Sequence, residues 1–177
     1  MNIKNLEIEG CYLIENFVAH DNRGCFVKTF HEEIFCNEGL QINFRESYYS
    51  ISKKNVIRGM HFQTPPHEHD KIVYVTKGEI LDVVLDIRKA SATYGKYISV
   101  KLNAHNYSIY IPKGCAHGFV TISEEAIVMY NVSSVYNSSA DGGILWNSFE
   151  FDWLEINPIL SERDKSFQSF KEFNSPF

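Results

Sequence analysis

The stretch that decides the fold is Lys71-Ile-Val-Tyr-Val-Thr-Lys-Gly-Glu-Ile-Leu-Asp-Val-Val-Leu-Asp-Ile87. Two runs rich in β-branched residues flank Lys77-Gly78, a pair with the composition of a turn, so the stretch predicts a β-hairpin. Similar short runs, broken by Gly, Pro, Asn or Ser, recur about every ten residues, which is typical of an all-β sandwich or barrel. They are residues 96–102, 107–111, 117–122 and 126–132.

The rest of the chain adds little helix and no second domain. Its 177 residues contain no repeat, low-complexity tract or linker, so we expect one domain over residues 1–177. Hydrophobic residues make up 44% and aromatic residues 14%, which argues against disorder and favours strands. Short helices are expected at residues 31–37 and at residues 162–173, where Phe167, Phe170 and Phe173 recur at helical spacing.

Composition also excludes several classes of protein. The first thirty residues lack the apolar run of a secretory signal, and no segment approaches the roughly 20 apolar residues of a membrane span, so we expect a soluble, cytoplasmic protein. The net charge of −5 disfavours nucleic-acid binding, although clustered Arg and Lys could still bind a diphosphate. The cysteines form no CxxC pair and are expected to be free thiols, with Cys115 packed; they are Cys11, Cys25, Cys36 and Cys115.

Two carboxylates interrupt the apolar run after Gly78. Asp82 and Asp86 are four positions apart, so the alternation of a strand places them on one face. If that face lines a barrel, they need cationic partners such as Arg58, Lys71 or Arg88. A solvated face is the alternative, and the spacing does not choose between the two.

Residues 111–119 contain a Pro-x-Gly-x-x-His arrangement, in which Pro112 and Gly114 shape a tight turn before His117. This segment resembles the second sequence motif of cupin barrels, many of which bind a transition metal. The metal-binding Glu of the first cupin motif lies seven positions before a turn Gly, and counting back from Gly78 gives Lys71. An ammonium repels a divalent cation, so we expect no metal.

One histidine pair is the remaining argument for a metal. His67 and His69 could serve as ligands. However, Pro65, Pro66 and Glu68 surround them, which indicates an exposed loop with a solvated histidine pair.

A larger set of motifs carries a more specific resemblance. Between residues 21 and 164 the sequence resembles the dTDP-4-dehydrorhamnose 3,5-epimerase family in the order and spacing of its motifs. The resemblance implies a cupin-like antiparallel β-barrel (jelly roll) with short peripheral helices, a homodimer, and no metal or organic cofactor. The matching positions are residues 21–24, 58–63, 71, 78–88, 91–95, 111–119, 129–130, 143–147 and 160–164.

The implied activity is inversion of C3 and/or C5 of a nucleoside-diphosphate 4-keto-6-deoxyhexose, in deoxysugar and polysaccharide biosynthesis. The C4 ketone acidifies both C–H bonds, so the reaction needs a base, an acid on the opposite face and a cation for the enolate oxygen. By resemblance the base is His61, oriented by Asp164, while Lys71 stabilises the enolate and Tyr130 supplies the proton. Histidine suits a base because its ordinary pKa is near neutrality.

Each of these residues also has a purely structural interpretation. Taken alone, His61 and Tyr130 could be packing residues, and Asp164 could cap a C-terminal helix. The register with the family favours the chemical roles.

The resemblance also assigns the substrate-binding residues. Arg can hold phosphate through two parallel hydrogen bonds, and a solvated surface charge is the alternative for any one of them. The aromatic residues Phe26 and Tyr136 are expected to stack on the base or the sugar, and in the family the N-terminal residues reach across from the partner subunit. The expected set is Arg23, Phe26, Lys28, Glu46, Tyr48, Arg58, Gln63, Asp82, His117, Tyr136 and Arg163.

The sequence departs from the family pattern around the expected nucleotide contacts. A Gln-Asp-Asn run is here Glu46-Ser47-Tyr48, a Glu is replaced by Lys28, and the Lys that commonly follows the tyrosine is Asn131. We therefore hypothesise unchanged proton chemistry with CDP or GDP in place of dTDP, or with a changed sugar. Whether C3, C5 or both are inverted stays open.

Four other functions remain open on the sequence. A single-site epimerase or a 3,4-ketoisomerase on a non-dTDP nucleotide sugar would use the same first proton abstraction. A metal-dependent cupin would require a bound cation, against which Lys71 argues. A non-catalytic sugar-binding barrel has no need of His61, Tyr130 and Asp164, all of which are present.

Overall fold

The computed structural model describes residues 1–40, 43–154 and 156–177, in which strands greatly outnumber helices. The elements are β1 (Asn2–Asn5), β2 (Tyr12–Glu15), β3 (Phe17–Asp21), β4 (Gly24–Lys28), α1 (Glu32–Asn37), β5 (Glu46–Lys53), β6 (Ile57–Gln63), β7 (Lys71–Lys77), β8 (Glu79–Asp86), β9 (Tyr97–Asn103), β10 (Tyr107–Ile111), β11 (Cys115–Thr121), β12 (Glu125–Val132), β13 (Asp141–Gly143) and α2 (Glu162–Lys165). Neither helix in this part of the chain is long and apolar enough to cross a membrane.

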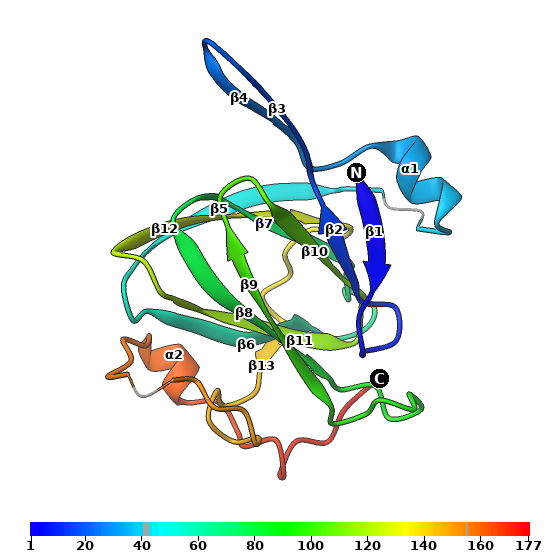
Figure 1. Cartoon of the computed structure of the whole chain (residues 1–177). Helices are drawn as coiled ribbons and strands as arrows, with labels where there is room; N and C mark the ends of the chain where they lie inside the picture. The colour runs from blue at the N-terminus through cyan, green and yellow to red at the C-terminus, as the bar shows by residue number, and fades with distance from the viewer. Residues whose placement is uncertain (41–42, 155) are drawn as a thin grey trace.

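The strands form two facing sheets and a separate hairpin (Figure 1). The first sheet has six strands in the order β1-β2-β10-β7-β12-β5, and the second has five in the order β13-β6-β11-β8-β9. All pairings between these strands are antiparallel. The predicted all-β, cupin-like antiparallel barrel with short peripheral helices is therefore confirmed.

The strands on either side of Gly78, β7 and β8, are both present, but they do not form a hairpin. β7 pairs with β10 and β12 in the first sheet, whereas β8 pairs with β9 and β11 in the second. Gly78 makes the corner between the sheets with φ +80°, and a Cβ there would lie 2.1 Å from the Glu125 carbonyl oxygen. The prediction of local pairing was wrong because the chain crosses from one sheet to the other at Gly78 instead of folding back on itself.

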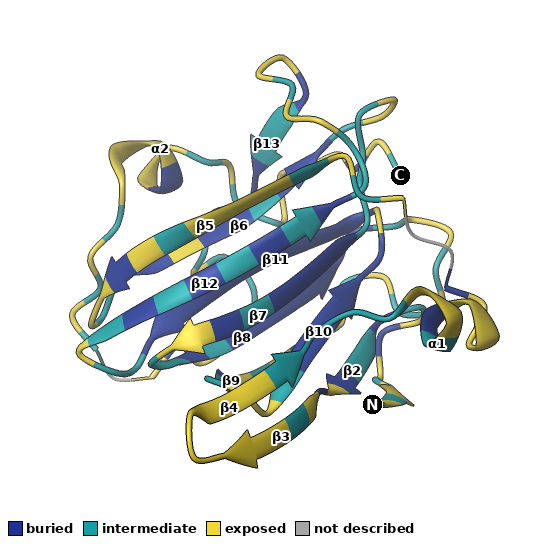
Figure 2. Cartoon of the chain, turned by 90° about the horizontal axis from the view of Figure 1, so that it is seen from above, coloured by how far each residue is buried: buried dark blue, intermediate teal, exposed yellow. Residues whose placement is uncertain are grey.

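The main core fills the space between the sheets. It includes Val73 and Val75 from β7, Val84 from β8, Phe119 from β11 and Val128 from β12, and Figure 2 shows these strands largely buried. Removing such side chains from water is the dominant favourable term in folding. The same sandwich leaves a polar cavity between the sheets, where the candidate site lies.

A second core lies on the outer side of the five-stranded sheet. The C-terminal segment, orange to red in Figure 1, runs across that face. Its aromatic residues pack against Met60, Phe62 and Leu85. This wrapping places α2 beside β6, which brings the side-chain carboxylate of Asp164 to His61 on that strand.

Of the two predicted helices, one is confirmed and the other is confirmed only in its first turn. Helix α1 occupies the expected place, but α2 ends at Lys165 instead of continuing to residue 173. Phe167, Phe170 and Phe173 lie against three different partners, namely His61, Tyr94 and Phe62. Their spacing therefore reflects tertiary packing and not one helical face.

Asp82 and Asp86 are both buried on the inner side of β8, so the solvated-face alternative is wrong. Asp86 accepts hydrogen bonds from Arg88, Ser91 and Thr93. The expected cationic partner is thus present, supported by two hydroxyl groups. The prediction for the cysteines is also confirmed: all four are free, and Cys115 is buried.

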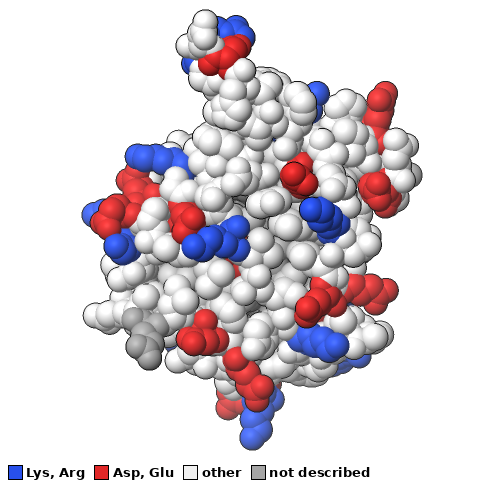
Figure 3. Space-filling model, in the orientation of Figure 1, with Lys and Arg blue, Asp and Glu red and all other residues white. Residues whose placement is uncertain are grey.

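The β3–β4 hairpin projects from the barrel (Figure 1) and is mostly exposed in Figure 2. Among the residues that the structure describes, its two strands pair only with one another. On the face in Figure 3, positive and negative side chains are interspersed and do not gather by sign.

Candidate active site

The cavity between the sheets has two lobes that share three residues. The first, which we call the Arg163 lobe, has a volume of about 320 Å³. The second, the Tyr130 lobe, has about 290 Å³. Tyr48, His61 and Lys71 line both, so the lobes are adjoining parts of one site. Volumes in this range suit a small-molecule ligand.

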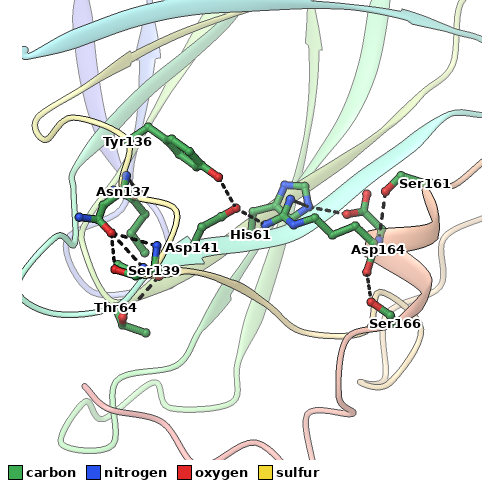
Figure 4. Close-up of polar contacts among 12 residues, drawn as sticks. His61, Thr64, Tyr136, Asn137, Ser139, Asp141, Ser161, Asp164 and Ser166 are labelled. Carbon is green, nitrogen blue, oxygen red and sulfur yellow. Dashed lines mark hydrogen bonds and ion pairs between the residues drawn. The ribbon is translucent and has the colours of Figure 1, made fainter.

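His61 and Asp164 form a hydrogen-bonded pair although 103 residues separate them. His61 Nε2 and Asp164 Oδ1 lie 2.7 Å apart, and Figure 4 shows the carboxylate approaching the imidazole from α2. With the Nε2 proton donated to this carboxylate, Nδ1 keeps the lone pair that can accept a proton. Asp164 is not the helix cap, because Ser161 Oγ accepts a hydrogen bond from the Asp164 N–H.

Asp164 is held in its charged form. Burial by itself would raise the pKa of this carboxyl, but the hydrogen bond from His61 and the charges of His61 and Arg163 outweigh burial and lower it. Only 3% of Asp164 is exposed, so its charge acts on His61 with little screening by water. A positive charge developing on the imidazole is therefore stabilised.

Lys71 is the first residue of β7, and its buried ammonium group lies beside His61. Its Nζ donates a hydrogen bond to the His61 carbonyl oxygen at 3.3 Å. Burial lowers the pKa of Lys71 to about 8, against an opposing effect of the Asp82 carboxylate. The group thus carries a positive charge below that pH, in a site shielded from water, where it can stabilise an anion.

Tyr130 faces the pair from the opposite wall. It lies on β12 of the first sheet, whereas His61 lies on β6 of the second, and both line the Tyr130 lobe. Burial raises the pKa of the Tyr130 phenol, so the group holds its proton at neutral pH. Its ring stacks on Tyr48, with centroids 4.8 Å apart, and meets His117 edge-on.

His117 and Asp82 form a second buried pair, with Nε2 and Oδ2 2.8 Å apart. Burial lowers the pKa of His117 in spite of Asp82, so the imidazole is neutral in the resting site. His117 lines the Tyr130 lobe, whereas Asp82 lies behind it. Asp82, which was expected to bind substrate, thus contacts His117 and does not itself line either lobe.

The open side of the Arg163 lobe carries both signs of charge. Arg163 Nη2 lies 2.6 Å from Asp141 Oδ2, and the Tyr136 hydroxyl donates to the same oxygen at 3.3 Å (Figure 4). The Tyr136 N–H donates to Glu46 Oε2 at 2.6 Å. Asp141 was not among the predicted site residues, because nothing in its local sequence distinguishes it from a surface carboxylate.

Arg58 and Gln63 lie at the site in different ways. Arg58 lines the Tyr130 lobe and is held by a hydrogen bond from Nε to Ser52 Oγ at 2.9 Å. The Gln63 amide donates to the His67 carbonyl oxygen at 2.8 Å and accepts from the Asn137 N–H at 2.6 Å. Gln63 thus forms hydrogen bonds to the loop of His67 and to the loop of Asn137, beside the cavity.

The histidine pair before β7 differs from the expectation of a solvated loop. His67 and His69 are both half-buried, and His69 lines the Arg163 lobe near Lys71. Burial, with a smaller effect of the Lys71 charge, lowers the pKa of His69 to about 3, so the imidazole is neutral. His69 reaches the site because of the way its loop folds. The neighbouring prolines and Glu68 had indicated an exposed loop instead.

Three expected substrate-binding residues do not reach the cavity of their own chain. Arg23, Phe26 and Lys28 lie on the projecting β3–β4 hairpin and line neither lobe. Phe26 is 60% exposed, and Arg23 pairs with its neighbour Asp21.

No group of three or more His, Cys, Asp or Glu side chains converges as a metal-ligand set among the residues described. The positive charge at the centre of the site belongs to Lys71. A carboxylate-supported imidazole, a buried ammonium and an opposing phenol can move protons at a carbon next to a carbonyl group. The fold and the site together define an acid–base isomerase built in a cupin-like barrel.

Comparisons with known proteins identify its family. The family model described as dTDP-4-dehydrorhamnose 3,5-epimerase matches residues 5–172. The chain is 38% identical to dTDP-4-dehydrorhamnose 3,5-epimerase of Shigella flexneri over 174 residues, which cover 96% of each protein. This protein belongs to the dTDP-4-dehydrorhamnose 3,5-epimerase family and is a nucleotide-sugar epimerase.

Solved structures agree with this assignment. The crystal structure of dTDP-4-dehydrorhamnose 3,5-epimerase from Elizabethkingia anophelis superposes with a TM-score of 0.91 at 35% identity, covering 99% of both chains. The dTDP-6-deoxy-D-glucose-3,5-epimerase of Legionella pneumophila, in complex with dTDP-4-keto-L-rhamnose, has a TM-score of 0.93 at 31% identity, covering 98% of this chain and 94% of that one.

Proposed function

We propose that the protein inverts C3 and C5 of a dTDP-linked 4-keto-6-deoxyhexose, with His61 as base and Tyr130 as acid. The observation that carries the proposal is the position of these two groups on opposite walls of the Tyr130 lobe. Inversion requires removal of a proton from one face of a carbon and delivery to the other. A base and an acid that face each other meet this requirement.

In the proposed reaction, His61 takes the proton from the carbon next to the C4 ketone, and the C–H electron pair moves into the enolate. The Lys71 ammonium stabilises the charge on the enolate oxygen, and Asp164 stabilises the imidazolium. Tyr130 then gives its proton to the opposite face, where the enolate π electrons form the new C–H bond. Solvent reprotonates the phenolate and takes the proton from His61.

The nucleotide is proposed to be dTDP. The Legionella pneumophila relative is described in complex with dTDP-4-keto-L-rhamnose, which supports a dTDP-linked 4-keto sugar as the substrate class. Glu46, Tyr48 and Lys28 depart from the family pattern, so CDP- and GDP-linked sugars are the alternatives to compare. Arg58 and Arg163 are the guanidinium groups of the two lobes, and both are suited to a diphosphate.

We also propose that the protein works as a homodimer in which the hairpin completes the site of the partner. Arg23 and Phe26 are exposed on an arm that leaves its own barrel, and Ile51 on edge strand β5 is 52% exposed. Apolar side chains in such positions favour contact with a second copy. A cytoplasmic location stays a prediction from the sequence.

Mixed dimers test the contribution of the hairpin. Preparations of His61→Ala and Arg23→Met are each expected to be impaired, and mixing them after dissociation should restore activity. In the hybrid, one site then combines the intact His61 of one chain with the intact Arg23 of the other. Hybrids that stay as impaired as the parent variants would show that Arg23 does not act in the partner's site.

The reaction itself is tested in deuterated water. Incubation with dTDP-4-keto-6-deoxyglucose and its CDP and GDP counterparts, followed by NMR of the products, reports the nucleotide, the carbons exchanged and their configuration. We expect deuterium at C3 and C5 with the dTDP sugar. His61→Ala should block exchange, whereas Tyr130→Phe should permit exchange but suppress inversion. Migration of the carbonyl group would identify a ketoisomerase, and undiminished exchange in His61→Ala would exclude that residue as the base.

A further inference from the structure

Tyr48 covers the face of the proposed acid. The two tyrosines lie directly opposite one another in the register between β5 and β12. Their ring centroids are 4.8 Å apart and their planes differ by 18°, so the rings are stacked. Cross-strand aromatic pairs of this kind restrict both side chains.

The stack leaves the Tyr130 ring with neighbours on two sides. Tyr48 covers one face, while the His117 ring lies 6.2 Å away at an interplanar angle of 70°. His117 is itself held by its hydrogen bond to Asp82. The direction of the Tyr130 hydroxyl within the lobe is therefore set by its neighbours as well as by its own rotamer.

Tyr48 is also the boundary between the two lobes. It lines both of them, whereas Tyr130 lines only the lobe named after it. Tyr48 lies on edge strand β5 and is 42% exposed, while Tyr130, on the neighbouring strand, is only 8% exposed. Without the Tyr48 ring, Tyr130 would be open to water and to the Arg163 lobe.

We propose that Tyr48 is a positioning residue that holds Tyr130 in the pose for proton delivery and so decides how often the enolate is inverted. This inference rests on the proposed function, because it assumes that Tyr130 is the acid. An enolate has two outcomes: it regains a proton on the His61 side with retention, or it receives one from Tyr130 with inversion. A phenol that samples other poses delivers its proton less often, while abstraction by His61 continues.

Replacing Tyr48 by Asn separates the ring from the rest of the position. An Asn side chain has no ring to stack on Tyr130. Tyr48→Asn therefore removes the stack at a position that is 42% exposed on an edge strand, where a smaller polar side chain can be solvated.

The test compares exchange with inversion at each carbon. In deuterated water, the ratio of deuterium incorporated with retention to deuterium incorporated with inversion is measured by NMR for four variants. Tyr48→Asn is expected to raise this ratio about 2- to 10-fold, the effect of losing one aromatic stack. Tyr48→Phe keeps the ring and should leave the ratio unchanged. Tyr94→Asn is the matched control, because Tyr94 is 40% exposed and lines neither lobe.

The fourth variant, Tyr130→Phe, separates the positioning role of Tyr48 from the proposed role of Tyr130 as the acid. If Tyr130→Phe raises the ratio and Tyr48→Asn does not, the positioning role is refuted while the proposed function stands. A parallel loss of exchange and inversion in Tyr48→Asn also refutes it, because that is the result of a merely structural role. A raised ratio in Tyr48→Phe would assign the effect to the hydroxyl and overturn the stacking argument. If Tyr130→Phe leaves the ratio unchanged, the acid is not Tyr130 and the proposed function fails.

Discussion

Replacing Asp164 by Asn is the sharpest test of the His61–Asp164 pair. The substitution keeps the size of the side chain and removes one negative charge at a position that is only 3% exposed. The amide can still accept a hydrogen bond from His61 Nε2, so the ring orientation can be preserved. What is lost is the charge that stabilises the imidazolium formed after proton abstraction.

The size of the effect follows from the contact. A hydrogen bond to a charged group contributes about 1.5–3 kcal/mol, and each 1.36 kcal/mol changes a rate about tenfold, so kcat should fall about 10- to 150-fold. Arg163 Nη1 lies 3.5 Å from the same His61 nitrogen, so the variant keeps this positive charge, paired with Asp141, beside the imidazolium while the Asp164 charge is lost. The result is therefore expected in the upper part of this range. KM should change little, because Asp164 lines neither lobe.

The assay is the initial rate of deuterium exchange and of epimerisation at saturating dTDP-4-keto-6-deoxyglucose. Glu162→Gln is the matched control, since it makes the same carboxylate-to-amide change two positions earlier in α2, where Glu162 forms an exposed ion pair with Lys165. Thermal denaturation of both variants checks that α2 still packs on the barrel. A kcat for Asp164→Asn within about twofold of the Glu162→Gln value, or a loss confined to KM, would refute the reasoning.

Three further predictions concern pH and packing. Because burial lowers the pKa of Lys71 to about 8 and the ammonium is the charged, active form, kcat should fall about tenfold per pH unit above that value, as a pH–rate profile will show. Burial would raise the pKa of Asp86, but its hydrogen bonds outweigh burial and lower it, so this carboxylate stabilises the fold above its ordinary pKa of about 3.9 and that stability is lost as the pH falls. Asp86→Asn should therefore show a weaker fall in Tm on acidification than the wild type. Gly59 has φ +138°, and a Cβ there would lie 2.5 Å from the Gly118 Cα, so Gly59→Ala should cost about 1–3 kcal/mol of stability in thermal denaturation. Gly39→Ala, with φ +78° and no atom within 4 Å, is the control for backbone strain alone, and an equal loss would contradict the steric argument.

The strands themselves were predictable because their signal is local. Runs of β-branched residues separated by turn formers marked β7 to β12, and the structure confirms them. The partners of those strands were not predictable in the same way. β7 and β8 are consecutive in the chain yet belong to opposite sheets, since pairing depends on which strands of the whole chain bury their faces together.

The proposed chemical groups could also be named from the sequence, through the spacing of their motifs. His61, Lys71, Tyr130 and Asp164 all stood out, and the fold brings His61 and Asp164 into contact across 103 residues. Asp141 carried no such signal. It joined the site only through its contacts with Arg163 and Tyr136. Tyr48 was expected to bind substrate, but its stacking on Tyr130 depends on the pairing of β5 with β12.

The sequence by itself determined the strand content, the family motifs and the kinds of side chain available for acid–base chemistry, because these are properties of neighbouring residues. Only the tertiary structure decided which of those side chains share a cavity and how exposed each one is. Burial and nearby charges then set the pKa values of Lys71, His69 and Asp164, and burial depends on segments far apart in the chain. The projection of the β3–β4 hairpin away from the barrel is likewise a property of the tertiary structure.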